Sequence, residues 1–239
     1  MKKEIVKLDC IKHIYSDKTE VEICGLSFVA YEGDKVALIG PNGSGKTTLL
    51  NHIIGILRPI KGKVRVFGLD PNRDFQKVIR KTGVVFQDVN DQLIGPTVWD
   101  DILFSPMNYG LDMENVKKEA EKLIKYFEIE HLKHKIPHYL SGGEKKKVAI
   151  VGALITQPEL LILDEPFGQL DDESKNNLIK KLDKINKELK TTIIISTNDL
   201  GIVKNFVDVI YLLEDRKIKL KMTPKEFFRK RIKYKVCRH

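Results

Sequence analysis

The sequence contains one stretch with the residue types of a phosphate-binding loop. It reads GPNGSGKT and fits the pattern G-x-x-x-x-G-K-[ST] directly after the apolar run VALIG. Three glycines let the backbone wrap so that its N–H groups face an anion: Gly40, Gly43 and Gly45. Lys46 can reach the β- and γ-phosphate oxygens of a nucleotide, and the Thr47 hydroxyl can ligate Mg²⁺. The motif therefore predicts a nucleotide-phosphate site, reinforced by the dipole of the helix-compatible stretch that follows.

A second motif supplies two carboxylates at the end of an apolar run. In LLILDEP, a buried strand would deliver Asp164 to the Mg²⁺ shell. Glu165 beside it can orient and polarise an attacking water as a general base. An Asp-Glu pair alone is equally typical of a solvated turn. Its position after an apolar strand and downstream of the glycine-rich loop favours phosphoryl transfer.

A third motif, LSGGE, prepares a helix N-terminus that can hold a second anion. Phosphoryl transfer needs hydrogen-bond donors on the γ-phosphate from the side away from the P-loop. The donors here are the Ser141 hydroxyl, the Gly142 and Gly143 amides and the helix that begins near Glu144. If a helical insertion holds them far from Lys46, one chain cannot bring both motifs to one nucleotide. Two copies arranged head to tail would complete each other's sites.

Short apolar runs predict the strands that position these motifs. They are VEICGLSFV and KVALIG within residues 21–39, KVRVFG (63–68), GVVF (83–86), LLIL (160–163), TIIIS (192–196) and VIYLL (209–213). Helical stretches between such runs indicate parallel, buried strands. We expect a mostly helical insertion over about 88–158, because apolar residues of one stretch share a helical face: Val116, Ala120, Leu123, Ile124 and Phe127.

Polar residues follow four of the predicted strands. The P-loop follows VALIG, Gln87 follows VVF, Asp164 and Glu165 follow LLIL, and Asn198 and Asp199 follow TIIIS. In open α/β sheets, ligands bind outside the carboxyl ends of the strands. The sequence therefore predicts that these side chains meet at one crevice.

Composition is that of an ordinary globular protein, with 42% hydrophobic and 31% charged residues among 239. No apolar run approaches the roughly 18–20 residues that span a bilayer, and the N-terminus lacks the apolar segment of a signal peptide. The three cysteines, Cys10, Cys24 and Cys237, are scattered without CxxC spacing. This spacing argues against a disulfide framework and against a metal site, and it favours a reducing cytosol.

The net charge of +9 comes from the end of the chain. Residues 216–239 hold eleven Lys or Arg against one acid, Glu226, so they carry +10 and the first 215 residues sum to −1. A solvated basic tail is the plainest interpretation, and contact with anionic lipid headgroups or nucleic acid is the alternative. Because a DNA-binding role predicts basicity in the body of the protein, we expect no nucleic-acid partner.

With its motifs in this order, the chain resembles an ATP-binding subunit of ABC transporters from near the N-terminus to about residue 225. The resemblance implies an α/β P-loop NTPase with a mostly parallel sheet, an N-terminal antiparallel β part and an inserted helical subdomain. We expect one such domain over 1–225 and a basic tail over 226–239. The implied activity is ATP hydrolysis coupled to transport, with ATP and Mg²⁺ as cofactors. The implied partners are a second, identical or related ATPase subunit and transmembrane subunits, at the cytoplasmic face of the cell membrane.

The resemblance also implies residue roles. The nucleotide-binding residues are Tyr15, Gly40, Pro41, Asn42, Gly43, Ser44, Gly45, Lys46, Thr47 and Thr48. The Mg²⁺ residues are Thr47, Gln87 of the Q-loop and Asp164, and the catalytic residues are Lys46, Gln87, Glu165 and Asn198. The signature residues that reach a partner's nucleotide are Ser141, Gly142, Gly143 and Glu144, and Asp171 in GQLD is the D-loop aspartate. Tyr15 matches an aromatic that stacks on adenine, although the sequence alone is equally compatible with a core aromatic.

One position departs from the family pattern. A histidine usually follows ST at the end of the last catalytic strand, whereas this chain reads STND with Asn198 there. Asparagine still donates a hydrogen bond, but it is shorter and carries neither a proton nor a charge. We hypothesise that this chain hydrolyses ATP slowly by itself, either beside a better-equipped partner or as a trap for bound nucleotide.

A narrower resemblance comes from VFQDVNDQLIGPTVWDDILFSPMNYGL (85–111), which is similar to the ATPases of energy-coupling factor importers of cobalt, nickel or vitamins. In that family the segment lines a groove for a helix of the membrane subunit. Four apolar residues would furnish the groove: Leu93, Ile94, Trp99 and Phe104. The alternative is a packed helical subdomain with these side chains turned inward.

Three rival functions differ in what they require. A chromosome-maintenance ATPase would need a long coiled coil between Gln87 and Ser141, and these residues are only 54 positions apart. A degenerate, structural ATP-binding subunit is motivated by Asn198 and opposed by the intact Lys46 and Glu165. The ATP subunit of a conventional ABC importer or exporter is the third alternative. The cargo is not predicted, because such an ATPase never contacts it.

Overall fold

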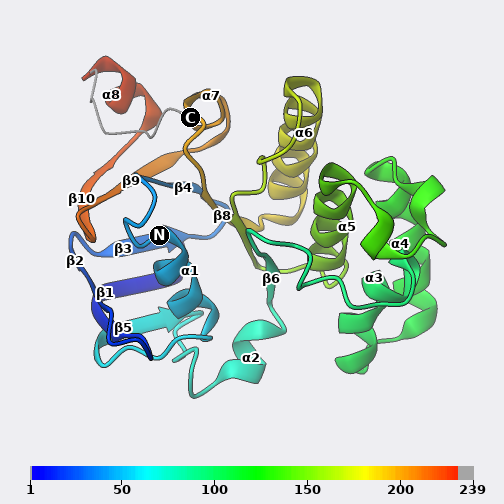
Figure 1. Ribbon diagram of the computed structural model, residues 1–239, viewed down its shortest axis with the longest axis horizontal. Helices are drawn as coiled ribbons and strands as arrows, with labels where there is room; N and C mark the ends of the chain where they lie inside the picture. Colours follow the sequence, from blue (N-terminus) through cyan, green and yellow to red (C-terminus); the bar gives the residue numbers. More distant parts are fainter. Residues whose placement is uncertain (1, 231–239) are drawn as a thin grey trace.

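A computed structural model describes residues 2–230, so the part of the basic tail over 231–239, with Cys237, lies outside the described residues. The chain forms one mixed sheet in the order β3-β1-β2-β10-β9-β4-β8-β7-β6, with β5 paired to β1 outside this path (Figure 1). The strands are β1 Glu4–Ile14, β2 Glu20–Gly25, β3 Phe28–Tyr31, β4 Lys35–Ile39, β5 Lys61–Val66, β6 Thr82–Val85, β7 Leu160–Asp164, β8 Thr192–Ser196, β9 Val209–Glu214 and β10 Lys217–Met222.

The central strands β9, β4, β8, β7 and β6 pair with one another in parallel, and β10 joins β9 antiparallel. Every residue of β7 and β8 is buried, as expected for short apolar strands covered on both faces. Alternate residues face two cores: Ala37 and Ile39 of β4 join one hydrophobic cluster, while Val36 and Leu38 join the other. The carboxyl ends of β4, β8, β7 and β6 therefore meet at one edge of the sheet, as the sequence predicted.

The N-terminal part is antiparallel, as expected. Strand β1 pairs antiparallel with β2, β3 and β5. The run VEICGLSFV, expected as one strand, forms two, β2 and β3. Two further strands were not predicted. One is β1 itself, and the other is β10, which lies in the basic stretch from Arg216 onward and pairs with β9 and β2. Ile218 of β10 is buried.

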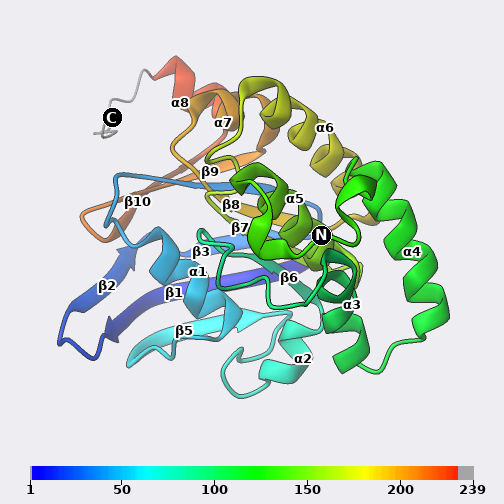
Figure 2. The ribbon, with the colours of Figure 1, turned by 45° about the vertical axis from the view of Figure 1, so that its right-hand side comes forward.

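The helices are α1 Lys46–Ile54, α2 Phe75–Ile79, α3 Val98–Asn108, α4 Met113–Tyr126, α5 Gly142–Leu154, α6 Asp172–Leu189, α7 Leu200–Phe206 and α8 Pro224–Arg229, with 3₁₀ turns η1 Glu130–Leu132 and η2 Pro137–Tyr139. Between β6 and β7 lie α3, α4 and α5, on the opposite side of the molecule from β1, β2 and β5 (Figures 1 and 2). This helical layer and the sheet agree with the expected α/β fold with an inserted helical subdomain. Within the described residues, no helix has the length and hydropathy needed to cross a bilayer.

The predicted amphipathic face of α4 is confirmed, with Val116, Ala120 and Ile124 buried. Polar side chains cap the N-termini of two helices in the helical subdomain. Thr97 and Asp112 accept hydrogen bonds from backbone N–H groups of α3 and α4. These caps fix where the chain enters each helix.

Two expectations are wrong. Cys10 and Cys24 form a disulfide, because antiparallel pairing of β1 with β2 places them side by side, with Cα atoms 4.1 Å apart. Their sulfurs also lie near the Glu22 carboxylate, but these three residues could act as metal ligands only with the disulfide reduced, because the thiolate is the form that binds a metal. The expected start of the basic tail at residue 226 is wrong, because Phe227 of α8 is buried against the body.

Candidate active site

The P-loop occupies the turn between β4 and α1, where two glycines are structurally required. Gly40 has φ 151°, and a Cβ there would lie 2.0 Å from the carbonyl oxygen of Leu213. Gly45 has φ 102° and starts α1. Only glycine adopts these conformations at low cost. The loop is thus pressed against β9 with its backbone wound around a small space.

Two buried polar groups of the loop fit a phosphate. The Ser44 hydroxyl is buried without a hydrogen-bond partner among the described residues. The Lys46 ammonium is also buried and donates to the carbonyl oxygens of Gly40 at 2.7 Å and Pro41 at 3.4 Å. A buried unpaired hydroxyl is costly unless a ligand satisfies it. Burial lowers the pKa of Lys46, while the carboxylates of Glu165 and Asp164 oppose that shift.

The end of β7 brings a carboxylate to the loop. The Thr47 hydroxyl donates to Asp164 Oδ2 at 2.8 Å, and the Ser196 hydroxyl of β8 donates to Asp164 Oδ1. Asp164 is buried, and an oxygen pair formed by a hydroxyl and a carboxylate is the donor set that Mg²⁺ prefers. The residues present therefore fit Mg²⁺, with Thr47 and Asp164 as the candidate ligands.

Glu165 is held in a backbone conformation unusual for a residue with a side chain. Its φ is 48°, and its N–H donates to the carbonyl and hydroxyl oxygens of Ser196 at 3.2 and 3.0 Å. Burial raises the pKa of the Glu165 carboxyl; the Lys46 and Lys146 ammonium groups oppose this shift, and the Asp164 charge adds to it. A strained, partly buried carboxyl with a raised pKa is typical of a general base.

Lys46, Thr47, Asp164 and Glu165 line one cavity of about 500 Å³, which we call the P-loop cavity. The lining residues are Thr19, Val21, Asn42, Gly43, Gly45, Lys46, Thr47, Thr48, Gln87, Asp164, Glu165 and Arg216. The structure therefore brings together the P-loop, the Q-loop glutamine and both carboxylates, which follow three of the four predicted strands, whereas Asn198 and Asp199 do not line this cavity. Sequence reasoning missed Thr19 and Arg216, which reach the cavity through the pairing of β2 with β10 and carry no local sequence signal.

The signature residues lie elsewhere. Ser141 caps α5 in a reciprocal capping box with Glu144, whose carboxylate accepts from the Ser141 amide at 2.8 Å and hydroxyl at 2.7 Å. These hydrogen bonds lower the pKa of Glu144. Among the described residues, no signature residue lines the P-loop cavity. Gly142 instead borders a neighbouring depression that also includes Gln87 and Glu165.

Three other predicted residues, Asp171, Asn198 and Tyr15, do not line the P-loop cavity. Asp171 is exposed and caps α6, accepting from the Ser174 amide at 2.9 Å. Asn198 is partly buried, and its Oδ1 has no hydrogen-bond partner within the described part of the chain. Tyr15 does not line the cavity; its hydroxyl bonds to Thr48 Oγ1 at 2.8 Å and its ring packs against the N-terminal core.

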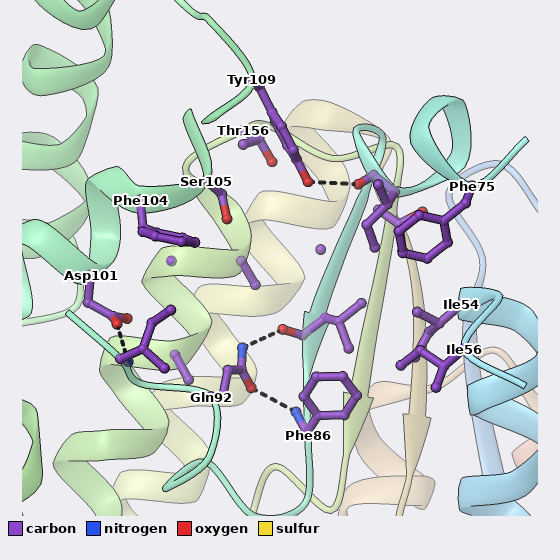
Figure 3. A pocket seen from close by; sticks show the side chains of 18 residues that line it. Ile54, Ile56, Phe75, Phe86, Gln92, Asp101, Phe104, Ser105, Tyr109 and Thr156 are labelled. Carbon is purple, nitrogen blue, oxygen red and sulfur yellow. Dashed lines mark hydrogen bonds between the residues drawn. The ribbon is translucent and has the colours of Figure 1, made fainter. Parts of the chain in front are cut away.

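A second, mostly apolar cavity of about 340 Å³ opens between the sheet and the helical subdomain (Figure 3). We call it the subdomain groove, and Ile54, Phe75, Phe86, Ile94, Phe104 and Tyr109 are among the residues that line it. Ile94 is 64% exposed and Phe104 is 43% exposed. The expectation for Leu93 and Trp99 is wrong, because both pack against the hydrophobic core instead of lining the groove.

Comparisons with known proteins agree with this geometry. The sequence profile of the ABC transporter family matches residues 23–168. The energy-coupling factor transporter ATP-binding protein EcfA of Methanocaldococcus jannaschii is 44% identical over 217 residues, which is 90% of this chain and 77% of that one. The EcfA protein of Methanococcus maripaludis is 41% identical over 221 residues, covering 91% of this chain and 79% of that one.

Solved structures give the same result. The protein cbiO1 from Clostridium perfringens, part of the ABC transporter complex cbiONQ, is 35% identical, with a TM-score of 0.84 over 96% of this chain and 92% of that one. A dimeric ATP-binding cassette bound to ADP and phosphate is 27% identical, with a TM-score of 0.82 over 92% of this chain and 99% of that one. The chain thus belongs to the ABC transporter family, as an ATP-hydrolysing subunit similar to those of energy-coupling factor transporters.

Proposed function

We propose that this chain powers an energy-coupling factor importer as one half of an ATPase dimer at the cytoplasmic face of the cell membrane. Each active site is shared between two chains. One chain supplies the P-loop, Gln87, Asp164 and Glu165, and the other supplies the signature helix, which is α5 with its cap Ser141. The observation that carries this proposal is the P-loop cavity, which gathers the phosphate, metal and base residues but is not lined by Ser141 or its glycines. Cassettes of this family function as dimers in transporter complexes, in agreement with this division.

The residues of the cavity have the chemistry that hydrolysis requires. Lys46 and the P-loop amides bind the β- and γ-phosphates of ATP. Glu165 accepts a proton from water while the water oxygen bonds to the γ-phosphorus and the bond to the bridging β-oxygen breaks. Bound between Thr47 and Asp164, Mg²⁺ would neutralise phosphate charge. Gln87 borders the same cavity and is placed to orient the water or the ion.

Signature donors of the partner chain would complete the charge stabilisation. The Ser141 hydroxyl and amide are occupied by the Glu144 carboxylate in the isolated chain, so this helix N-terminus already binds an anionic group. A γ-phosphate approaching from a second chain would take the same donors. We propose the Gly142 and Gly143 amides as the other donors and exposed Asp171 as an interface residue.

We propose the subdomain groove as the docking site for an apolar helix of a membrane subunit. Its exposed apolar residues Ile94 and Phe104 lie on the segment that resembles energy-coupling factor ATPases. The cargo, cobalt, nickel or a vitamin, contacts only the membrane partners. The ATPase would transmit dimer closure and opening to them through this groove.

A second candidate function, a weakly hydrolysing nucleotide-binding partner, is favoured by Asn198. Its Oδ1 is a buried acceptor without a partner among residues 2–230, where a histidine would present a ring N–H to the phosphate. Such a subunit would bind ATP, close the dimer and leave turnover to a related chain with histidine at this position.

Co-purification in mild detergent tests the proposed assembly. We expect the full chain to retain its membrane subunits, and Phe104→Asp to lose them because a charge in the groove opposes an apolar helix. The ATPase activity of the isolated chain should stay unchanged. Leu189→Asp is the matched control, since Leu189 is exposed on α6, outside the groove. Retention of the same membrane subunits by Phe104→Asp would overturn the docking site.

A further inference from the structure

Lys146 is a buried cation without an assigned role in ATP hydrolysis. It lies in the second turn of α5, after the signature residues, and its exposed fraction is 4%. The sequence EKKK offers three adjacent lysines, but Lys145 and Lys147 are partly exposed. A lysine is seldom buried to this degree unless a specific set of partners holds it.

The partners of Lys146 are backbone carbonyl oxygens at the ends of two catalytic strands. Its Nζ donates to Gln87 at 2.8 Å, to Phe86 at 3.4 Å and to Glu165 at 3.3 Å. An ammonium group has three N–H donors, so these carbonyls match its full capacity. One side chain of the signature helix therefore joins the Q-loop after β6 to the general base after β7.

The contact with Glu165 matters because that residue is held in a left-handed conformation. Its N–H is fixed by Ser196, with φ at 48°. Lys146 fixes the other end of the same residue through its carbonyl oxygen. A backbone conformation of this kind persists only where its surroundings over-determine it, so both contacts set the direction of the Glu165 carboxyl.

We propose that Lys146 is a positioning residue for hydrolysis, by which α5 holds the Glu165 carboxylate and the Q-loop in the geometry of attack. This inference rests on the proposed roles of Glu165 and Gln87. Because Ser141 caps the same helix, a movement of α5 toward a partner's nucleotide would also move the carbonyls of the chain's own base. Lys146 thereby couples two sets of residues. The signature residues of α5 act in the partner's active site, and Glu165 and Gln87 act in the chain's own active site.

The test separates positioning from folding and from nucleotide binding. In the full-length protein with its ATPase partner, Lys146→Met keeps the length of the side chain but removes the charge and the donors. We expect kcat to fall about 10²-fold, the loss typical of a misplaced catalytic group, while ATP affinity and Tm stay near the wild-type values. Lys146→Arg, which keeps charge and donors, should restore at least part of kcat.

Lys147→Met is the matched control, because it makes the same change one residue along α5 at a side chain that is partly exposed. It should keep kcat within about twofold, as expected for a surface site. A Lys146→Met enzyme with wild-type kcat overturns the proposal, and so does an equal loss in both variants. If Lys146→Met does not fold, Lys146→Gln is measured in its place with the same expectations. Loss of kcat with the membrane subunits still bound leaves the proposed assembly intact, so the two proposals fail separately.

Discussion

At the residue scale, the catalytic centre balances two buried lysines against two carboxylates. Lys46 enters from α1 and Lys146 from α5, and both lie close enough to Glu165 to oppose the rise in its pKa caused by burial. A general base must be unprotonated and near the reacting water, so both the charge balance and the backbone of Glu165 decide turnover.

Glu165→Gln should abolish most hydrolysis without preventing nucleotide binding. Its amide keeps nearly the same volume but cannot accept the proton, so we expect kcat to fall about 10²–10⁴-fold with ATP affinity retained. Steady-state phosphate release and equilibrium binding measure the two quantities. Glu173→Gln, at an exposed position of α6, is the control. A Glu165→Gln protein that hydrolyses ATP at the wild-type rate would exclude the carboxylate as the base.

Asn198→His tests whether asparagine limits the rate of the isolated chain. Histidine would place a ring N–H where Asn198 now buries an acceptor that has no partner in the described part of the chain. Removal of one transition-state donor costs about 10²–10³ in rate in other enzymes, so adding one should raise kcat measurably, by up to that factor. No gain in turnover would count against the hypothesis of a slow ATPase.

His52 should make stability depend on pH. Burial lowers the pKa of His52 below the ordinary value of 6.5, and the His13 charge lowers it further. The hydrogen bond with the Thr48 carbonyl opposes this shift. The unfolded chain therefore takes up a proton below about pH 6.5 that the folded protein resists, so stability is full above that pH and falls as pH drops toward the lowered folded value.

Denaturant unfolding at several pH values measures this effect. The free energy of unfolding should fall by at most about 1.4 kcal/mol per pH unit through that window because of His52. His52→Gln should reduce the slope, and His134→Gln, at an exposed site, should not. Equal slopes in wild type and His52→Gln would contradict the assignment.

At the element scale, α5 packs so closely on β6 that only glycine fits at one point. A Cβ at Gly83 would lie 2.4 Å from the carbonyl oxygen of Ala153 in α5. Gly83→Ala should therefore push the helix outward and cost about 1–3 kcal/mol of stability. Gly152→Ala in the same helix meets nothing within 4 Å and should gain about 0.5–1 kcal/mol. The same sign for both changes in chemical denaturation would refute this close approach.

Local patterns explain why most of the site could be predicted. Short continuous motifs identify the P-loop, the carboxylate pair after β7 and the signature. Buried strands are predicted from short apolar runs in the sequence. Strand β10 was missed because its lysines dominated the interpretation, although Ile218, Leu220 and Met222 alternate with them as in a half-buried strand.

Contacts between distant elements could not be predicted in this way. The disulfide of Cys10 with Cys24 depends on the register of β1 with β2, which spacing in the sequence does not reveal. Likewise, nothing local distinguishes Lys146 from its two lysine neighbours; only the packing of α5 against the ends of β6 and β7 does. Arg216 reaches the nucleotide cavity through the turn between β9 and β10.

At the scale of the whole molecule, one chain presents two different half-sites. One is the P-loop cavity with its base, and the other is the capped N-terminus of α5 with its signature donors. A two-fold, isologous pairing, in which each P-loop cavity faces the partner's α5 N-terminus, gives a symmetric dimer with two identical sites. Hydrolysis should therefore depend on protein concentration at levels where the dimer dissociates.

Mixing two inactive variants tests this division most directly. Glu165→Gln lacks the base but keeps its signature, and Ser141→Arg lacks the signature but keeps its base. A mixed dimer contains one site with both, so we predict turnover in the mixture well above that of either variant alone. Two results would contradict the account: full ATPase activity of Ser141→Arg by itself, or turnover in the mixture equal to the sum of the two variants measured separately. Either result would mean that a chain does not need the signature residues of a neighbour.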